Sequence, residues 1–352
     1  MIFFVAPLGE TWELEDYLKS YGKELLTRGC VLTWDQIVAR QELHLGSYVF
    51  LAIDQMSPTE KEIAVQCWDK LSQARSDVTL INHPSRVRLR YDLLQTCYER
   101  KRNTFRVRRG MDFLRCKKFP VFLRREHDHN ASISGLLFTH KELVRAIARS
   151  LYLGYRLRDL IIVEYCDTVD GAGMFRKYSS FIIGDRVLPH TLVHSDHWIT
   201  KSRGRLIDVA TAREELEYVQ TNPHRDWLRE TFALANIRYG RIDYGLLNGE
   251  PQVWEINTNP TIVRRPEAGP IPEEQRRMRD PVRQVFFPGL QAALEAIDSV
   301  ADPSQTLPIE VSQKQRRKLD DEQRRRLRVQ AKRTFISRGF GPLFRSIRRL
   351  LK

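Results

Sequence analysis

The stretch that decides the fold is Tyr239–Pro260, which is YGRIDYGLLNGEPQVWEINTNP. Apolar runs flank the Asn-Gly pair at 248–249, and this arrangement is the strongest short-range signal for a β-hairpin. Glu255 and Asn257 are two residues apart, so on a strand their side chains project from one face. The turn brings Asp243 back beside them, which predicts three oxygen donors on one sheet face.

This hairpin predicts a site for a metal ion that carries nucleotide phosphates. Two carboxylates and an amide are hard oxygen ligands, which Mg²⁺ requires in that role. Arg241 lies two residues before Asp243 and shares its face, where it would stabilise a phosphoryl group in transfer. A lone E-x-N is more often a solvated polar strand, but R-x-D, the turn and E-x-N-x-x-P occur together and favour the metal.

The same residues resemble the metal-binding end of the ATP-grasp superfamily and are most similar to its D-alanine–D-alanine ligase branch. The resemblance implies ATP and Mg²⁺ as cofactors, with Mn²⁺ as a substitute. It implies three metal ligands, Asp243, Glu255 and Asn257. It also implies catalytic roles for Arg241 and for Lys201, which lies where a γ-phosphate lysine would be. Thr261 replaces a family glycine and no amino-acid-recognition motif follows, so D-alanine is not implied as substrate.

The resemblance continues towards the N-terminus at lower specificity. Phe119–Arg125 is similar to a strand with the pattern P-V-x-x-K, with arginine at the ATP-binding lysine. Arginine binds phosphate as a fork, whereas lysine acts as a point charge. The segment 129–135 replaces the Ser/Gly loop that closes over phosphates, and Val163–Asp167 resembles the hinge that recognises adenine. In that hinge Glu164 would accept from the exocyclic amine, and the backbone at 165–166 would pair with the ring. The implied ATP-binding residues are Arg90, Arg124, Ser132, Ser134, Glu164, Tyr165, Cys166 and Asp167.

Strands and helices alternate in the first 85 or so residues, which predicts an open parallel α/β sheet. The expected elements are strands at Ile2–Pro7, Tyr48–Ile53 and Val78–Ile81 and helices at Leu14–Leu26 and Ser57–Leu71. The later pattern is mixed. We expect helices at 86–102, 139–153, 213–219 and 223–236, and strands at 119–125, 134–138, 160–166, 178–183, 186–193, 239–247 and 252–257.

The fold class is therefore α/β of mixed type, with an ATP-grasp fold implied by the resemblance. We expect an N-terminal α/β domain over 1–105, a small lobe over 106–185 and a large lobe with the metal site over 186–302. A basic tail would cover 303–352.

Charge is unevenly distributed along the chain. The 352 residues hold 58 Lys and Arg against 44 Asp and Glu, a net charge of +14. Residues 311–352 contribute +12 and residues 86–125 contribute +11, so the rest of the chain is at −9. A high pI suggests nucleic-acid binding. The distribution favours a nearly neutral body with a basic internal band at 86–125. This band would be a solvated helix face with phosphate contacts from Arg90 and Arg124. The alternative is a surface that binds an anionic substrate.

The tail has two parts. Residues 313–333 are polar nearly all round, which predicts at best an exposed helix. Residues 340–351 form a basic amphipathic pattern that suits an anionic membrane surface or a partner, and packing on the body of the chain is the alternative.

Five scattered cysteines without a C-x-x-C pair exclude a disulfide scaffold and a cysteine zinc site, and they fit a reducing compartment. The apolar N-terminus is short and has no basic residue before it, so we expect a cytoplasmic protein, at most peripheral on the inner membrane face. His190, His194 and His197 straddle a strand end, which favours a solvated loop or substrate contact over a zinc site.

The resemblance thus implies an ATP- and Mg²⁺-dependent ligase that joins a small or polymeric carboxylate to an amine-type (or related) nucleophile through an acyl phosphate. One alternative is a degenerate ATP-grasp module that binds ATP and associates with a membrane or a partner. The other is a basic nucleic-acid-binding protein, which would leave the acidic hairpin unexplained.

Overall fold

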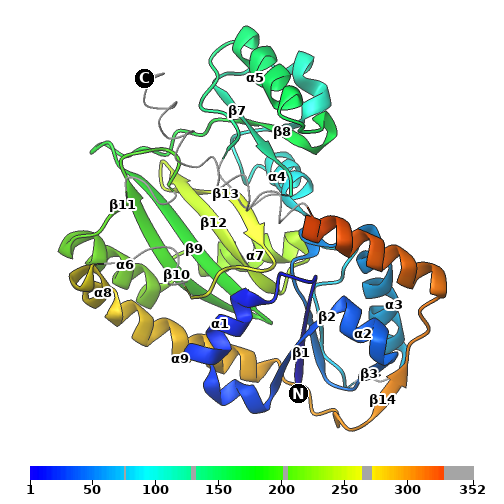
Figure 1. Ribbon diagram of the computed structural model, residues 1–352. Helices are drawn as coiled ribbons and strands as arrows, with labels where there is room; N and C mark the ends of the chain where they lie inside the picture. Colours follow the sequence, from blue (N-terminus) through cyan, green and yellow to red (C-terminus); the bar gives the residue numbers. More distant parts are fainter. Residues whose placement is uncertain (75–76, 128–131, 201–204, 264–271, 329–352) are drawn as a thin grey trace.

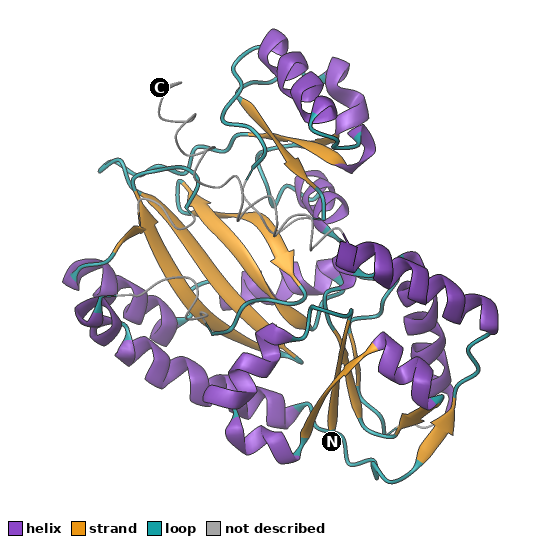
Figure 2. Cartoon of the chain, viewed as in Figure 1, coloured by secondary structure: helices purple, strands orange, loops and turns teal. Residues whose placement is uncertain are grey.

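The computed structural model describes residues 1–352 apart from 75–76, 128–131, 201–204, 264–271 and 329–352. Figures 1 and 2 show the small lobe at the top, the large antiparallel sheet at the left and the N-terminal sheet at the lower right. Parallel and antiparallel sheets occur in one chain, so the predicted mixed α/β class is confirmed.

The N-terminal sheet is parallel and has the strand order β2-β1-β4-β5. Its strands are β1 (Ile2–Ala6), β2 (Gly29–Thr33), β4 (Ser47–Phe50) and β5 (Leu80–Ile81). The helices α1 (Trp12–Ser20), α2 (Trp34–Arg40) and α3 (Pro58–Ala74) accompany it. The predicted helix at 14–26 is divided into α1 and the short 3₁₀ helix η1 (Lys23–Thr27). At Gly22, between them, a Cβ would come within 2.6 Å of the Tyr17 ring.

The small lobe contains an antiparallel sheet of β6 (Val107–Arg109), β8 (Leu160–Glu164) and β7 (Val121–Arg125), in that order. Helix α5 (His140–Tyr152) packs on it, and the Thr139 hydroxyl caps this helix by accepting from the Glu142 N–H at 3.2 Å. The return strand predicted at 134–138 is wrong, because only Leu137 forms a bridge, to Val121.

The large sheet is antiparallel with the order β11-β10-β9-β12-β13. Its strands are β9 (Phe175–Ile183), β10 (Arg186–Ser195), β11 (Arg205–Leu206), β12 (Tyr239–Leu247) and β13 (Glu250–Asn257). Strand β9 pairs with both β10 and β12 and so belongs to the large sheet, although the predicted boundary at 185 assigns it to the small lobe. The core of the large sheet includes apolar residues of α4 (Arg90–Glu99), α6 (Val209–Thr221) and α7 (Arg225–Ala235).

Helix α9 (Asp280–Ala296) joins the large sheet to the N-terminal sheet and was not predicted. Its buried Phe286, Leu290 and Leu294 belong to one cluster with Phe181 of β9 and Ile2 of β1. Figure 1 shows α9, preceded by α8 (Glu273–Met278), running along the lower edge of the large sheet. The two sheets therefore share a core.

The segment after α9 returns to the N-terminal domain. Strand β14 (Thr306–Pro308) pairs with β3 (Glu42–His44), and a helix follows over 313–328. Leu319 of this helix is 1% exposed, in a cluster with Ile309 and Val311. The expectation of an exposed tail helix is therefore wrong for this part, because one apolar side chain and several polar contacts anchor it. The amphipathic pattern at 340–351 lies outside the described residues. Among the described residues, no helix has the length and apolar character needed to cross a bilayer.

Candidate active site

The hairpin of β12 and β13 forms the acidic end of the site. Asn248 and Gly249 both have positive φ, 53° and 84°, which suits a tight Asn-Gly turn. The strand register pairs Asp243 with Glu255 and Arg241 with Asn257. These four side chains lie on one face, as the pattern predicts.

Asp243 is buried among polar partners. Its carboxylate accepts from the Lys177 ammonium, the Ser179 hydroxyl and the Arg241 Nε, each at 3.0 Å. Burial acts to raise its pKa, but Arg241 and Lys177 outweigh that effect and hold the pKa below its ordinary value. The carboxylate is therefore charged at neutral pH.

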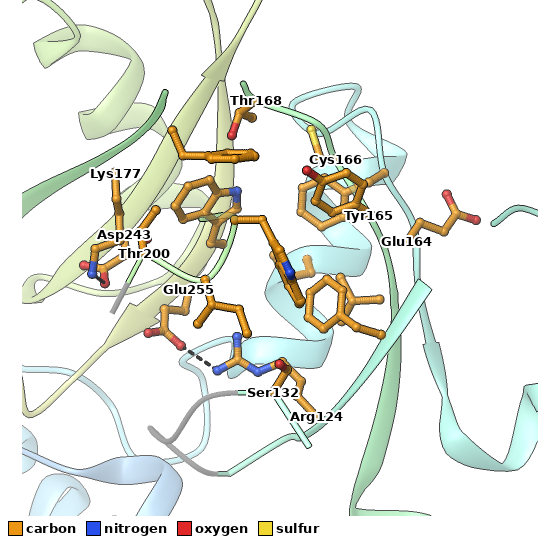
Figure 3. Close-up of a pocket in the computed structure, with 18 residues that line it drawn as sticks. Arg124, Ser132, Glu164, Tyr165, Cys166, Thr168, Lys177, Thr200, Asp243 and Glu255 are labelled. Carbon is orange, nitrogen blue, oxygen red and sulfur yellow. Dashed lines mark hydrogen bonds and ion pairs between the residues drawn. The ribbon is translucent and has the colours of Figure 1, made fainter. Parts of the chain in front are cut away.

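Glu255 forms ion pairs with Arg90 and Arg124, the two arginines for which the resemblance implies phosphate contacts. Arg124 Nη2 lies 3.1 Å from its carboxylate, and Arg90 contacts the same oxygen (Figure 3 draws the pair with Arg124). Arg90 is 6% exposed and also donates to the Glu126 carbonyl at 2.7 Å. Arg90 on α4 and Arg124 on β7 therefore converge on the Glu255 carboxylate of the hairpin.

The charge and the donor types of this end suit a metal–phosphate group. Among the described residues, four cations pair with two carboxylates: Lys177 and Arg241 contact Asp243, and Arg90 and Arg124 contact Glu255. The Asn257 amide oxygen accepts from the Asn259 N–H at 2.7 Å, and such an oxygen has a second lone pair. The described residues contain no cluster of three metal-binding acids, histidines or cysteines. Two carboxylates and an amide fit Mg²⁺ bound together with phosphates, because Mg²⁺ is usually held by few protein ligands plus substrate oxygens.

A cavity leads from this acidic end into the space between the lobes (Figure 3). Its other walls are largely apolar and come from both lobes. They include Leu94, Phe105, Phe122, Val163, Phe175, Trp198, Ile199 and Trp254. The rings of Phe122 and Trp198 lie 5.1 Å apart between centroids, and Tyr165 meets Trp198 edge-on at 5.9 Å. A flat, uncharged ring matches this part of the cavity, while anions match the other end.

The predicted hinge residues have different surroundings. Tyr165 and Cys166 line the cavity, but the Tyr165 N–H donates to the Pro120 carbonyl at 2.9 Å. The Glu164 carboxylate points away from the other cavity residues in Figure 3 and accepts from the Arg106 N–H at 3.0 Å. Asp167 is exposed and accepts from the Tyr165 hydroxyl at 3.0 Å. The carboxylates of Glu164 and Asp167 therefore support the hinge from outside the cavity.

The two predicted loop serines also differ. Ser132 lines the cavity, and its hydroxyl is buried with no hydrogen-bond partner among the described residues. Ser134 accepts from the Leu123 N–H at 2.9 Å and donates to the Gly135 carbonyl, so it fastens the loop to β7. His129 and Lys201 lie outside the described residues, although Thr200 next to Lys201 lines the cavity.

Much of the basic band at 86–125 is used inside the molecule. Arg88 donates to the Leu234 carbonyl, and Arg102 contacts Glu230 and lies over Trp227. Arg109 pairs with Glu126 and lies 3.6 Å over the Tyr91 ring. Arg88 and Arg102 thus contact helix α7, and Arg109 contacts Glu126 and Tyr91, which leaves fewer cations for an external polyanion.

The three histidines do not converge. His190 packs against the rings of Phe181 and Phe286, and burial lowers its pKa well below the ordinary value. His194 Nε2 lies 2.9 Å from Glu214, and His197 Nδ1 accepts from the Ile199 N–H. The solvated-loop expectation is wrong for His190 and His194, which occupy strand β10.

Sequence reasoning missed Lys177 and the aromatic wall. Lys177 contacts Asp243 from β9, and the two residues are 66 positions apart in sequence. Lys177 and Ser179 are two positions apart on β9, and this spacing indicates that their polar side chains lie on one face of the strand. Trp198 follows β10, and nothing in its local sequence indicates that it meets Phe122 of the small lobe.

No protein-family model matches the chain, and no curated protein matches its sequence. Solved structures with a similar arrangement include a D-alanine–D-alanine ligase from Bacillus anthracis complexed with ATP, at 11% identity and a TM-score of 0.46, covering 84% of this chain and 98% of that one. A D-alanine–D-alanine ligase from Coxiella burnetii has 13% identity and a TM-score of 0.42, and the match covers 84% of this chain and 98% of that one. A RimK domain ATP-grasp protein from Sphaerobacter thermophilus has 11% identity and a TM-score of 0.44, and the match covers 83% of this chain and 97% of that one. Likeness at this level transfers neither an activity nor a substrate to the chain.

Proposed function

We propose that the chain is an ATP- and Mg²⁺-dependent ligase of ATP-grasp type. It would activate a substrate carboxylate as an acyl phosphate and pass the acyl group to an amine-type nucleophile. The observation that carries the proposal is one cavity with an apolar aromatic wall at one end and the Asp243–Glu255 pair, with its four cations, at the other.

The two ends of the cavity suit the two ends of ATP. Adenine would lie among Phe122, Trp198 and Trp254, with hinge contacts from backbone atoms because the Glu164 carboxylate is engaged elsewhere. The triphosphate would extend towards Arg124 and Lys177, whose charges attract it.

Asp243, Glu255 and Asn257 would hold the Mg²⁺ ions. When bound, the metal neutralises phosphate oxygens and so eases attack by an anionic carboxylate. Arg90 and Arg124 contact Glu255 in the structure, and they would contact the phosphates where Glu255 served as a metal ligand.

Arg241 would stabilise the phosphoryl group in transfer. It is held by Asp243 and by the Thr261 carbonyl, at 3.0 and 3.2 Å. The substrate carboxylate oxygen would attack the γ-phosphorus and ADP would leave. An amine would then attack the acyl carbon and release phosphate. The enclosing walls would limit hydrolysis of the acyl phosphate by water.

A screen of pooled carboxylates and amines for release of ADP and phosphate tests the function. We expect release that requires both a carboxylate and Mg²⁺, and that is lost in Glu255→Gln. Glu250→Gln, an exposed change on the same strand, is the matched control. ATP-independent product formation, or equal release by Glu255→Gln and the wild type, would refute the proposal.

A further inference from the structure

The helix over 313–328 makes a buried ion pair with the N-terminal domain. Glu60, in the first turn of α3, is 0% exposed, and both of its oxygens accept from Arg326, at 3.1 and 2.7 Å. Such a fork-to-carboxylate pair is geometrically specific. Glu60 Oε2 also accepts from the Ser57 N–H at 2.7 Å, so the pair fixes the start of α3.

The same guanidinium holds the loop that precedes α3. Arg326 Nη2 donates to the Gln55 carbonyl at 2.8 Å. Gln55 ends the 3₁₀ helix η2 (Ile53–Gln55), whose first residue follows Ala52 with φ at +49°. A left-handed conformation is unfavourable for alanine and persists only where surrounding contacts enforce it. Arg326 supplies one of those contacts.

Helix η2 touches both sides of the candidate site. The Ile53 N–H donates to the Thr258 hydroxyl at 3.1 Å, and Thr258 directly follows Asn257 at the end of β13. The Gln55 side chain donates to the His127 carbonyl at 2.8 Å. His127 follows Glu126, whose carbonyl accepts from Arg90. Helix η2 therefore bridges the metal-binding strand and the phosphate-side arginine.

We propose that Arg326 is a positioning residue for the metal–phosphate end of the site, and that it acts through Glu60 and η2. The inference rests on the proposed function. The proposal states that the helix over 313–328, through the contacts of Arg326 with Glu60 and Gln55, sets the spacing between the end of β13 and the loop at 126–127. It should affect binding of the phosphates and not of adenine, because no residue of η2 lines the aromatic wall.

Binding of Mg·ATP and of adenosine, both measured by equilibrium titration with isothermal calorimetry, tests the proposal on the full chain. Arg326→Lys retains the charge but loses the fork, so we expect Mg·ATP to bind about threefold more weakly. Arg326→Ala should weaken it about tenfold, while adenosine affinity stays within about twofold of the wild type. Arg324→Ala, an exposed change on the same helix, is the control and should match the wild type.

Arg326→Ala leaves Glu60 buried and unpaired, which endangers folding. The double variant Glu60→Gln with Arg326→Met removes both charges and should remain folded while still binding Mg·ATP more weakly. A folded variant that binds Mg·ATP as the wild type does, or one that loses adenosine in parallel, would overturn the inference. If the wild type itself does not bind Mg·ATP, the proposed function fails instead.

Discussion

The residues at the two ends of the cavity come from the sequence in different ways: one end comes mainly from a single hairpin and the other from separate segments. The acidic end comes mainly from one hairpin, in which Asp243 and Glu255 are twelve positions apart and meet through a local turn. The aromatic end is assembled from separate segments, with Phe122 on β7, Trp198 after β10 and Trp254 on β13. A local pattern therefore indicates the metal–phosphate chemistry, whereas the base-sized slot emerges only from tertiary packing. The proposal assigns different parts of ATP to these ends, so variants at each end should separate the two contributions.

The largest effect is expected at the acidic end. Glu255→Gln removes a charge that the proposal gives to Mg²⁺ and should reduce ADP release by about 10²–10³-fold, the range seen when one key electrostatic group is removed. Adenosine affinity should hardly change, because the aromatic wall is intact. Paired titrations of Mg·ATP and adenosine check the separation. A parallel loss of both would mean that the two ends are not independent.

A change at the aromatic end should have a smaller effect, and it should weaken the binding of adenosine as well as of Mg·ATP. Trp198→Ala removes a stacking surface, and loss of one base–aromatic contact costs about 1–3 kcal/mol. Adenosine and Mg·ATP should weaken by the same factor, near tenfold. Tyr152→Ala, an aromatic 91% exposed on α5, controls for general loss of an aromatic residue. Weaker binding of Mg·ATP alone would place the base elsewhere.

This contrast also shows how far the sequence could be interpreted. The hairpin, its register and the parallel N-terminal sheet follow from periodicity and turn residues, which are local. Lys177 and helix α9 were missed because their partners are distant. The pattern around Arg326 predicts only a polar tail, because its buried partner Glu60 is 266 positions away.

Ser132 and Ser134 lie in one loop, and we expect one to affect nucleotide binding and the other to affect stability. Ser134→Ala leaves the Leu123 N–H without its acceptor and should cost about 1–3 kcal/mol of unfolding free energy. Ser132→Ala should leave stability within about 0.5 kcal/mol and weaken Mg·ATP binding a few-fold. Urea denaturation and nucleotide titration of both variants measure the two quantities. Equal behaviour of the two serines would contradict the division of roles.

The smallest expected effect is a pH dependence at the acidic end. The folded pKa of Asp243 lies below its ordinary 3.8, so its stabilising contribution is present above that value and is lost as the pH falls through the folded pKa. Asp243→Asn should therefore lose less stability than the wild type on acidification below about pH 4. Identical slopes of unfolding free energy against pH in the two proteins would contradict the ion-paired environment.

Competition on the wild-type chain tests the central claim most directly. Mg·ATP should change the tryptophan fluorescence of the chain in a saturable manner, because two of its six tryptophans, Trp198 and Trp254, line the cavity. Adenosine should compete with Mg·ATP, and EDTA should weaken the binding of ATP but not of adenosine. That pattern would mean that one cavity binds the base at its aromatic end and the metal–phosphate group at its acidic end. ATP binding that is indifferent to EDTA, or adenosine that does not compete, would contradict the account.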